Sequence, residues 1–213
     1  MIVRALAIWP FTAIIFAGLV FAGYVHGPWN GCWFFAMGCW FVLDTFWVLA
    51  AQTTKPIVPA RQYRRAALTS AVVHLLYCLP LSSVPVLGLQ ILPRSILPEA
   101  AGAALCVVGV GFAIWSRYVL AGNWNAAVPL QQRHQLVRSG PYAIVRHPIY
   151  LGFFLVVCGM ILALGEVRAL VCAIHATQFF HKMKLEENIL RETYPGEYPE
   201  YERKVKRLLP CIW

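Results

Sequence analysis

The chain has 213 residues, of which 60% are hydrophobic and only 13% are charged. A soluble domain of this size carries about a quarter of charged residues, so the composition excludes an ordinary soluble protein and indicates an integral membrane protein. The length accommodates about six spans of roughly 20 residues with short connections, in one helical domain without a soluble module.

The first four apolar segments are long enough to cross a membrane: residues 2–25, 31–52, 67 to about 92, and 100–120. Pro80 and Pro85 predict that the third segment is kinked or ends early. Gly102, Gly109 and Gly111 predict that the fourth segment packs closely against a neighbouring helix.

The last two apolar segments, 149–164 and 169–180, are short, at about 24 Å or less for a rise of 1.5 Å per residue. They either cross at a thin place or form a hairpin that only partly spans. The sixth segment continues without a break to Arg191, which predicts a helix projecting into the cytosol. The apolar end of the tail, 208–213, is expected to tuck against the membrane surface.

The predicted fold is therefore an all-α integral membrane protein, with about six transmembrane helices and a cytosolic C-terminal helix extension and tail. Residues 1–120 would form transmembrane helices one to four. Residues 121–213 would form a second region, with a short helical hairpin and the cytosolic C-terminal helix, within the same structural domain.

The basic residues predict the orientation in the membrane. With both termini in the cytosol, 16 of the 18 lysines and arginines fall on the inner side, and only Arg94 and Arg168 lie outside. Membrane topology and anionic headgroups thus account for the net charge of +9, and no nucleic-acid partner is expected.

Asp44, the cysteines and the histidines were considered as possible site residues. Asp44, inside the second segment, is either functional or bonded to a neighbouring helix, because an acid within a span is costly. The seven cysteines contain no C-x-x-C pair and mostly lie in apolar runs, which is typical of packing residues. The histidines lack zinc spacing, so no metal is expected.

Residues 139–150 contain two tyrosines, an arginine and a histidine at the point where a basic loop leads into an apolar helix. Pro148 suits the first turn of that helix and forces His147 before it into an extended shape. The helix N-terminus beside Arg146 and His147 favours an anionic or electron-rich group.

A second polar cluster lies on the same side of the membrane. On a helix, Lys182 and Glu186 are i,i+4 partners, which indicates either an exposed ion pair or part of a site. The acids Glu186 and Glu187 are expected to lie opposite Arg146 and His147. A carboxylate, basic groups and aromatic rings together suit a zwitterionic, aromatic cofactor.

The motifs of the second half resemble those of a known enzyme family. They are Gly140-Pro-Tyr-x-x-Val-Arg-His-Pro-x-Tyr-x-Gly152, Glu186-Glu-x-x-Leu, Tyr198-x-x-Tyr201 and Val205-x-Arg207-Leu-Leu-Pro210. Over about residues 120–213, the chain resembles the isoprenylcysteine carboxyl methyltransferase family, which is related to membrane phospholipid methyltransferases. The resemblance implies transfer of a methyl group from S-adenosylmethionine to a lipophilic acceptor.

The resemblance also implies that residues 121–213 are the cofactor-binding catalytic region, and it implies site residues. Those for S-adenosylmethionine are Gln131, His134, Gln135, Leu136, Val137, Tyr142, His147, Pro148, Ile149, Tyr150 and Glu186. Lys182 lies where members that modify prenylcysteine place a substrate-binding arginine, and a lysine is a point charge without the bidentate fork. Lys182, Glu187 and Arg146 are the candidate catalytic residues.

The expected function is thus membrane-embedded methyl transfer to an isoprenylcysteine carboxylate, with a phospholipid amine or a thiol as the alternative acceptor. The substrate would enter from the bilayer and meet an active site facing the cytosol, in a bacterial inner membrane or an endoplasmic-reticulum type of membrane. Two other classes are a sterol-reductase-like NADPH enzyme and a non-catalytic protein that binds lipid.

Overall fold

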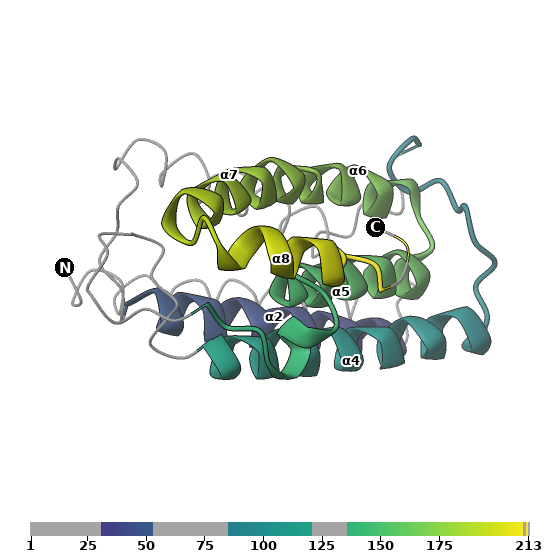
Figure 1. The fold of residues 1–213 in the computed structure, drawn as a ribbon. Helices are drawn as coiled ribbons and strands as arrows, with labels where there is room; N and C mark the ends of the chain where they lie inside the picture. Colours follow the sequence, from purple (N-terminus) through teal and green to yellow (C-terminus); the bar gives the residue numbers. More distant parts are fainter. Residues whose placement is uncertain (1–30, 53–84, 121–135, 211, 213) are drawn as a thin grey trace.

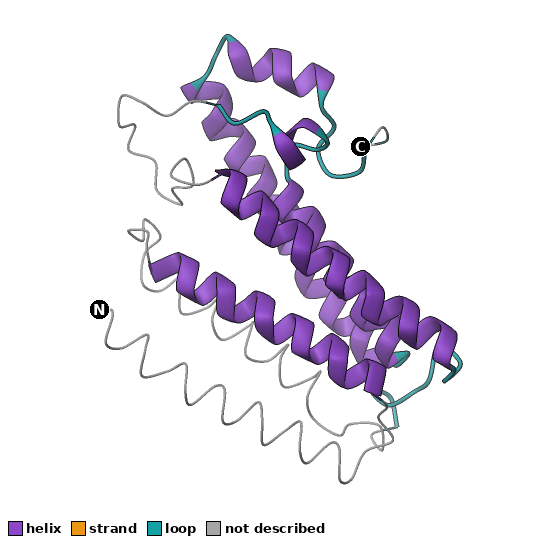
Figure 2. Cartoon of the chain, turned by 90° about the horizontal axis from the view of Figure 1, so that it is seen from below, coloured by secondary structure: helices purple, strands orange, loops and turns teal. Residues whose placement is uncertain are grey.

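The computed structural model describes residues 31–52, 85–120, 136–210 and 212, and its described part is helical without a named strand (Figures 1 and 2). The elements are α2 (Gly31–Gln52), α4 (Ile96–Leu120), η3 (Gly140–Ala143), α5 (Pro148–Leu164), α6 (Val167–Ala176), α7 (Gln178–Thr193) and α8 (Glu197–Lys204). The first apolar segment, most of the third and the side chain of Asp44 lie outside the described residues.

The helix α4 is the element whose length and hydropathy fit a membrane span. Among the described helices it is the one that meets both criteria, and α5, with 17 residues, is apolar but shorter. The helix begins at Ile96, four residues before the predicted Ala100. Pro98 is tolerated there because the first four N–H groups of a helix have no partner within it. The number of spans and the cytosolic extension stay predictions.

The helices α4 and α5 pack through glycines, and α2 lies beside them (Figure 1). A Cβ atom on Gly102 would lie 2.5 Å from the carbonyl oxygen of Gly159, and one on Gly109 would lie 2.6 Å from that of Gly152. Within α4 the two glycines are seven residues apart, and so are the two glycines within α5. Each helix therefore presents its glycines on one face, and the two backbones approach closely. For Gly111, none of the described residues lies within 4 Å of the Cβ position, so this part of the chain shows no close packing there.

At one end of these helices, residues 89–92 close over the turn between α5 and α6. Gly165 ends α5 in the left-handed region, with φ 65°. Its carbonyl accepts hydrogen bonds from the N–H groups of Ile91 (2.8 Å) and Leu92 (3.2 Å). Residues 85–88 form a turn, so no helix continues from there to Leu92. Pro80, the other position at which a kink or an early end was predicted, lies outside the described residues.

The helices α6 and α7 return alongside α5 and complete the predicted hairpin. They lie along one line in Figure 1, separated by Thr177, which keeps helix-like angles (φ −61°, ψ −24°). The unbroken helix predicted to Arg191 is therefore nearly right. The interruption spans one residue, and α7 ends at Thr193.

The segment after α8 returns to the loop before α5. Residues 145–147 and 205–207 lie side by side. The N–H of Arg146 donates to the carbonyl of Lys206 at 2.8 Å, and the N–H of His147 donates to that of Arg207 at 3.0 Å. Leu208 is buried, whereas Ile212 is exposed. The return of residues 205–207 into the protein was not predicted.

Candidate active site

The site is built around the start of α5, and the local backbone follows from the sequence. Gly140, with φ 59°, begins η3 in the left-handed region, which glycine adopts without steric cost. Pro148 occupies the first turn of α5, as predicted. His147 is non-helical at φ −121° and ψ 62°, although it is not fully extended. Its carbonyl accepts the first helical hydrogen bond, from Leu151 at 3.0 Å.

A fully buried carboxylate, that of Glu187, lies at the centre of the polar network. It accepts hydrogen bonds from Arg146 at 2.9 and 3.1 Å, from Arg207 at 2.5 and 3.0 Å, and from Nε2 of His147 at 3.2 Å. Burial alone would raise the pKa of Glu187, but the hydrogen bonds from His147, Arg207 and Arg146 outweigh it and hold this pKa well below its usual range. Glu187 is therefore charged at neutral pH.

A second acid, Glu202 of α8, extends the network towards solvent. Its carboxylate accepts hydrogen bonds from Arg191 at 2.7 and 3.1 Å and from Arg146 at 3.4 Å. Arg146 also donates to the carbonyl oxygens of Glu202 at 3.0 Å and Val205 at 2.7 Å. Arg146 thereby ties the loop before α5 to α7, to α8 and to the segment after α8.

The neighbouring acid Glu186 has a different environment, because 47% of its side chain is exposed. It accepts a hydrogen bond from the hydroxyl of Tyr150 at 2.5 Å, and its other oxygen lies 3.6 Å from Nδ1 of His147. His147 is thus held between two carboxylates. Burial would lower the pKa of His147, but the carboxylates of Glu186, at ion-pair distance, and Glu187, at hydrogen-bond distance, outweigh it and raise this pKa.

Phe179, Lys182 and Glu186 are spaced three and four residues apart, so they lie along the same side of α7. Lys182 is exposed, and among the described residues it has no hydrogen bond or ion pair. Of the two alternatives for Lys182 and Glu186, the exposed ion pair is therefore absent from the contacts of the described residues. Glu186 is engaged by Tyr150 and His147 instead.

An aromatic cluster continues from Tyr150 into the helix pair. Phe179 lies 5.3 Å from Tyr150, 5.5 Å from Phe153 and 5.9 Å from Phe154, measured between ring centroids. Trp47 of α2 joins it, 5.1 Å from Phe153. We did not predict this cluster, although the i, i+3, i+4 spacing of the aromatic residues on α5 is a signal in the sequence.

The structure brings together only part of the predicted cofactor set. His147, Tyr150 and Glu186 are in mutual contact. Gln131, His134 and Gln135 lie outside the described residues, and Leu136 and Val137 are partly buried before η3. Tyr142, Pro148 and Ile149 are buried.

Tyr142 has a partner that was not predicted. Its backbone carbonyl accepts a hydrogen bond from the hydroxyl of Tyr201 at 2.6 Å. Burial raises the pKa of Tyr142, and the charge of Glu186 raises it further, so its hydroxyl stays protonated. Sequence reasoning also missed the roles of Arg191, Glu202 and Arg207. Arg207 belongs to a quoted motif, but nothing in the spacing indicated its partner.

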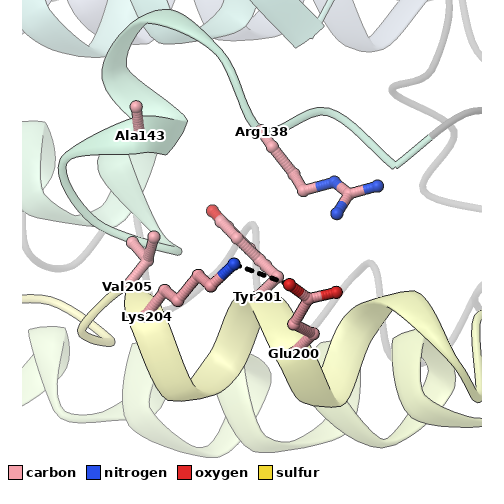
Figure 3. Close-up of a pocket in the computed structure, with 6 residues that line it drawn as sticks. All are labelled: Arg138, Ala143, Glu200, Tyr201, Lys204 and Val205. Atoms are coloured by element: carbon pink, nitrogen blue, oxygen red, sulfur yellow. Dashed lines mark hydrogen bonds and ion pairs between the residues drawn. The ribbon is translucent and has the colours of Figure 1, made fainter.

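A separate pocket lies between α8 and the loop that carries Arg138 (Figure 3). It has a volume of about 250 Å³ and is lined by Arg138, Ala143, Glu200, Tyr201, Lys204 and Val205. Its charges are paired: Lys204 donates to Glu200 at 2.6 Å, and Arg138 pairs with Glu197. None of the predicted site residues lines it, so we do not assign it to the active site.

Comparisons with known proteins agree with the motifs. Residues 102–192 match the model of the Isoprenylcysteine carboxyl methyltransferase (ICMT) family. The chain is 37% identical over 102 residues to the protein-S-isoprenylcysteine O-methyltransferase of Schizosaccharomyces pombe, covering 46% of this chain and 43% of that protein. It is 31% identical over 118 residues to the rat enzyme of the same name, covering 54% of this chain and 42% of that protein. These matches span less than half the length of either relative.

A solved structure has a similar fold over the whole chain. It is described as the eukaryotic intramembrane Ras methyltransferase ICMT (isoprenylcysteine carboxyl methyltransferase) without a monobody. The similarity has a TM-score of 0.55 at 18% identity and covers 100% of this chain and 87% of the other. The two chains share a helical fold, and the resemblance drawn from the motifs is confirmed for residues 102–192.

Proposed function

Since residues 102–192 match the isoprenylcysteine carboxyl methyltransferase family, we propose that this chain is a membrane-embedded methyltransferase that uses S-adenosylmethionine and methylates the carboxylate of a prenylated cysteine. One observation carries the proposal beyond the family match. The half-exposed carboxylate of Glu186 is held by His147 and Tyr150 at the mouth of an aromatic-lined helix pair.

The side chains present fit the methyl donor. S-adenosylmethionine carries an ammonium, and Glu186 offers an accessible carboxylate, oriented by the hydroxyl of Tyr150. Buried residues beside it, Tyr142, Pro148 and Ile149, would form the wall of the site. Leu136, Val137, Gln131, His134 and Gln135 are proposed to complete it.

When bound, S-adenosylmethionine supplies a sulfonium methyl that is already activated. A carboxylate acceptor needs no general base, so the protein must align the acceptor with the methyl group and exclude water. The aromatic cluster serves the second purpose, since it places apolar rings directly beside Tyr150.

The order of side chains along α7 suits the binding of an acceptor that has an apolar tail and an anionic head. At a rise of 1.5 Å per residue, Lys182 lies about 6 Å along the helix from Glu186, and Phe179 lies about 4.5 Å further. A lipid tail would contact the aromatic cluster, its anionic head would lie near Lys182, and the donor would lie at Glu186. Such a substrate would enter laterally from the bilayer.

A phospholipid amine or thiol is the second candidate acceptor, and Lys182 is the observation that favours it. A lysine binds a phosphate as readily as a carboxylate, because it acts as a point charge. The anionic head common to both classes is the feature that the site would recognise.

Calorimetry with S-adenosylmethionine on the purified protein tests the donor site. Glu186→Gln should weaken binding by about 1.5–3 kcal/mol, or roughly 10- to 150-fold, if the carboxylate pairs with the ammonium. Glu192→Gln is the matched control, because Glu192 is an exposed acid on the same helix. Equal affinity in the two variants would contradict the proposed role of Glu186.

A methyl-transfer assay tests the acceptor. It compares a farnesylated thiol-acid, its uncharged amide and the same head without a tail. The tailed acid should react best, and Lys182→Ala should slow it more than the amide, whereas Lys184→Ala, on the neighbouring exposed face, should slow neither. Efficient turnover of the tailless compound would rule out a lipid acceptor.

A further inference from the structure

The buried ionic network connects three stretches that lie far apart in the sequence. Arg146 belongs to the loop before α5, Glu187 to the middle of α7, and Arg207 to the segment after α8. The side chain of Glu187 has an exposure of 0%, so a bound molecule cannot reach its oxygens without displacing an arginine. Glu187 therefore contacts neither donor nor acceptor.

Arg207 binds both oxygens of the Glu187 carboxylate. It donates from two nitrogens to both carboxylate oxygens, at 3.0 and 2.5 Å. Arg146 divides its donors between Glu187, Glu202 and two backbone carbonyls. A buried carboxylate is stable as an ion only while such partners surround it, so Arg207 contributes directly to the fixed position of Glu187.

His147 connects this buried pair to the exposed acid. Its Nε2 donates to Glu187 at 3.2 Å, and its Nδ1 faces the carboxylate of Glu186 at 3.6 Å. An imidazole held at one nitrogen presents the other in a fixed direction. The orientation of the ring, and with it one side of the Glu186 carboxylate, thus depends on where Glu187 is held.

Building on the proposed function, we propose that Arg207 and Glu187 are positioning residues of the methyl-donor site. Arg207 holds Glu187, Glu187 orients His147, and His147 sets the carboxylate of Glu186 that faces the donor's ammonium. Glu187 and Arg146 then act through His147 and are not catalytic residues. The segment 205–207 is part of the frame of the site, although it does not touch the donor.

The first test is the affinity of the full chain for S-adenosylmethionine, measured by calorimetry beside the melting temperature. Arg207→Lys keeps the charge but cannot keep both hydrogen bonds, so the dissociation constant should rise about fivefold to tenfold. The rate at saturating donor should change little. Arg203→Lys is the matched control, an exposed arginine of α8, and should bind as the wild type does.

A double-mutant cycle distinguishes positioning from general destabilisation. His147→Asn removes the connection, so Arg207→Lys should weaken donor binding no further in that background. An equal weakening with and without His147, or unchanged affinity in Arg207→Lys, would overturn the proposal. If the wild type does not bind the donor, the proposed function itself fails, which is a different result.

A further variant covers the case in which Arg207→Lys is too unstable to measure. Glu187→Gln combined with Arg207→Met removes both charges of this pair together. The amide oxygen of the glutamine can still accept from Arg146 and His147, and Arg146 keeps its bonds to Glu202 and Val205. This double variant should remain folded and should still bind the donor weakly. Wild-type affinity in the folded double variant would refute the positioning role.

Discussion

The glycine contact between α4 and α5 leads to a prediction in which one substitution isolates a steric cost. In Gly109→Ala, the new Cβ would lie 2.6 Å from the carbonyl oxygen of Gly152 and 2.9 Å from the backbone N of Val156. Both are backbone atoms, so the helices must separate, at a cost of about 1–3 kcal/mol. Gly111→Ala, on the same helix, is the control, because no atom of the described part of the chain lies within 4 Å of its Cβ position.

Both substitutions gain about 0.5–1 kcal/mol from the higher helix propensity of alanine, so this gain cancels between them. The difference in unfolding free energy should therefore equal the steric cost of about 1–3 kcal/mol, which corresponds to roughly 2–4 °C in melting temperature per kcal/mol. Thermal unfolding in detergent measures it. Equal melting temperatures for Gly109→Ala and Gly111→Ala would refute the close packing of these helices.

Three further predictions concern the polar contacts. Tyr201→Phe removes the buried hydrogen bond to the backbone of η3 and should cost about 1–3 kcal/mol in thermal unfolding; an unchanged melting temperature would contradict the contact. The pKa of His147 is raised, so the contribution of His147 to stability is present below about pH 6.5 and is lost as pH rises through the folded pKa. The pKa of Glu187 is lowered, so the contribution of Glu187 to stability is present above about pH 4.3 and is lost as pH falls through the folded pKa. Melting curves across pH should show His147→Asn without the alkaline loss, and an identical alkaline slope would count against this. Arg94→Ala removes an ion pair of 2.8 Å to the fully buried Glu166 and should lower stability by about 1–3 kcal/mol, with Arg94→Lys intermediate; equal stability of all three forms would refute it.

The sequence was sufficient for features that depend on local rules. The bounds of α2 match the predicted segment 31–52, because a long apolar run in a helix needs no tertiary information. Pro148 at the first turn of α5 follows from the ring's fixed φ and missing N–H. The prediction that Glu186 and Glu187 lie opposite Arg146 and His147 also agrees with the structure, because a tight hairpin leaves few other arrangements.

Contacts between segments that are far apart in the sequence were not predictable in the same way. The i,i+4 rule favours a Lys182–Glu186 pair, but the carboxylate of Glu186 instead accepts a hydrogen bond from the hydroxyl of Tyr150, which belongs to another helix. Arg207 lies in a charged tail that is typical of a solvated surface, and only the pairing of residues 205–207 with 145–147 brings it to Glu187.

Helical spacing separates the three glycines of α4. Gly102 and Gly109 are seven residues apart and share the face that meets α5, whereas Gly111 is two residues further and lies on another face. Residue type alone does not make this distinction, but the helical period does.

The side-by-side arrangement of residues 145–147 and 205–207 has a consequence for the order in which the molecule matures. During synthesis the loop before α5 emerges first, and about 60 residues follow before Arg207 exists. Until that residue has left the ribosome, Glu187 lacks one of its cations and His147 lacks the backbone acceptor of its N–H. The helices α5 to α7 can therefore form before the polar network is complete, and a nascent chain stalled short of residue 207 would hold these helices without the assembled ionic network.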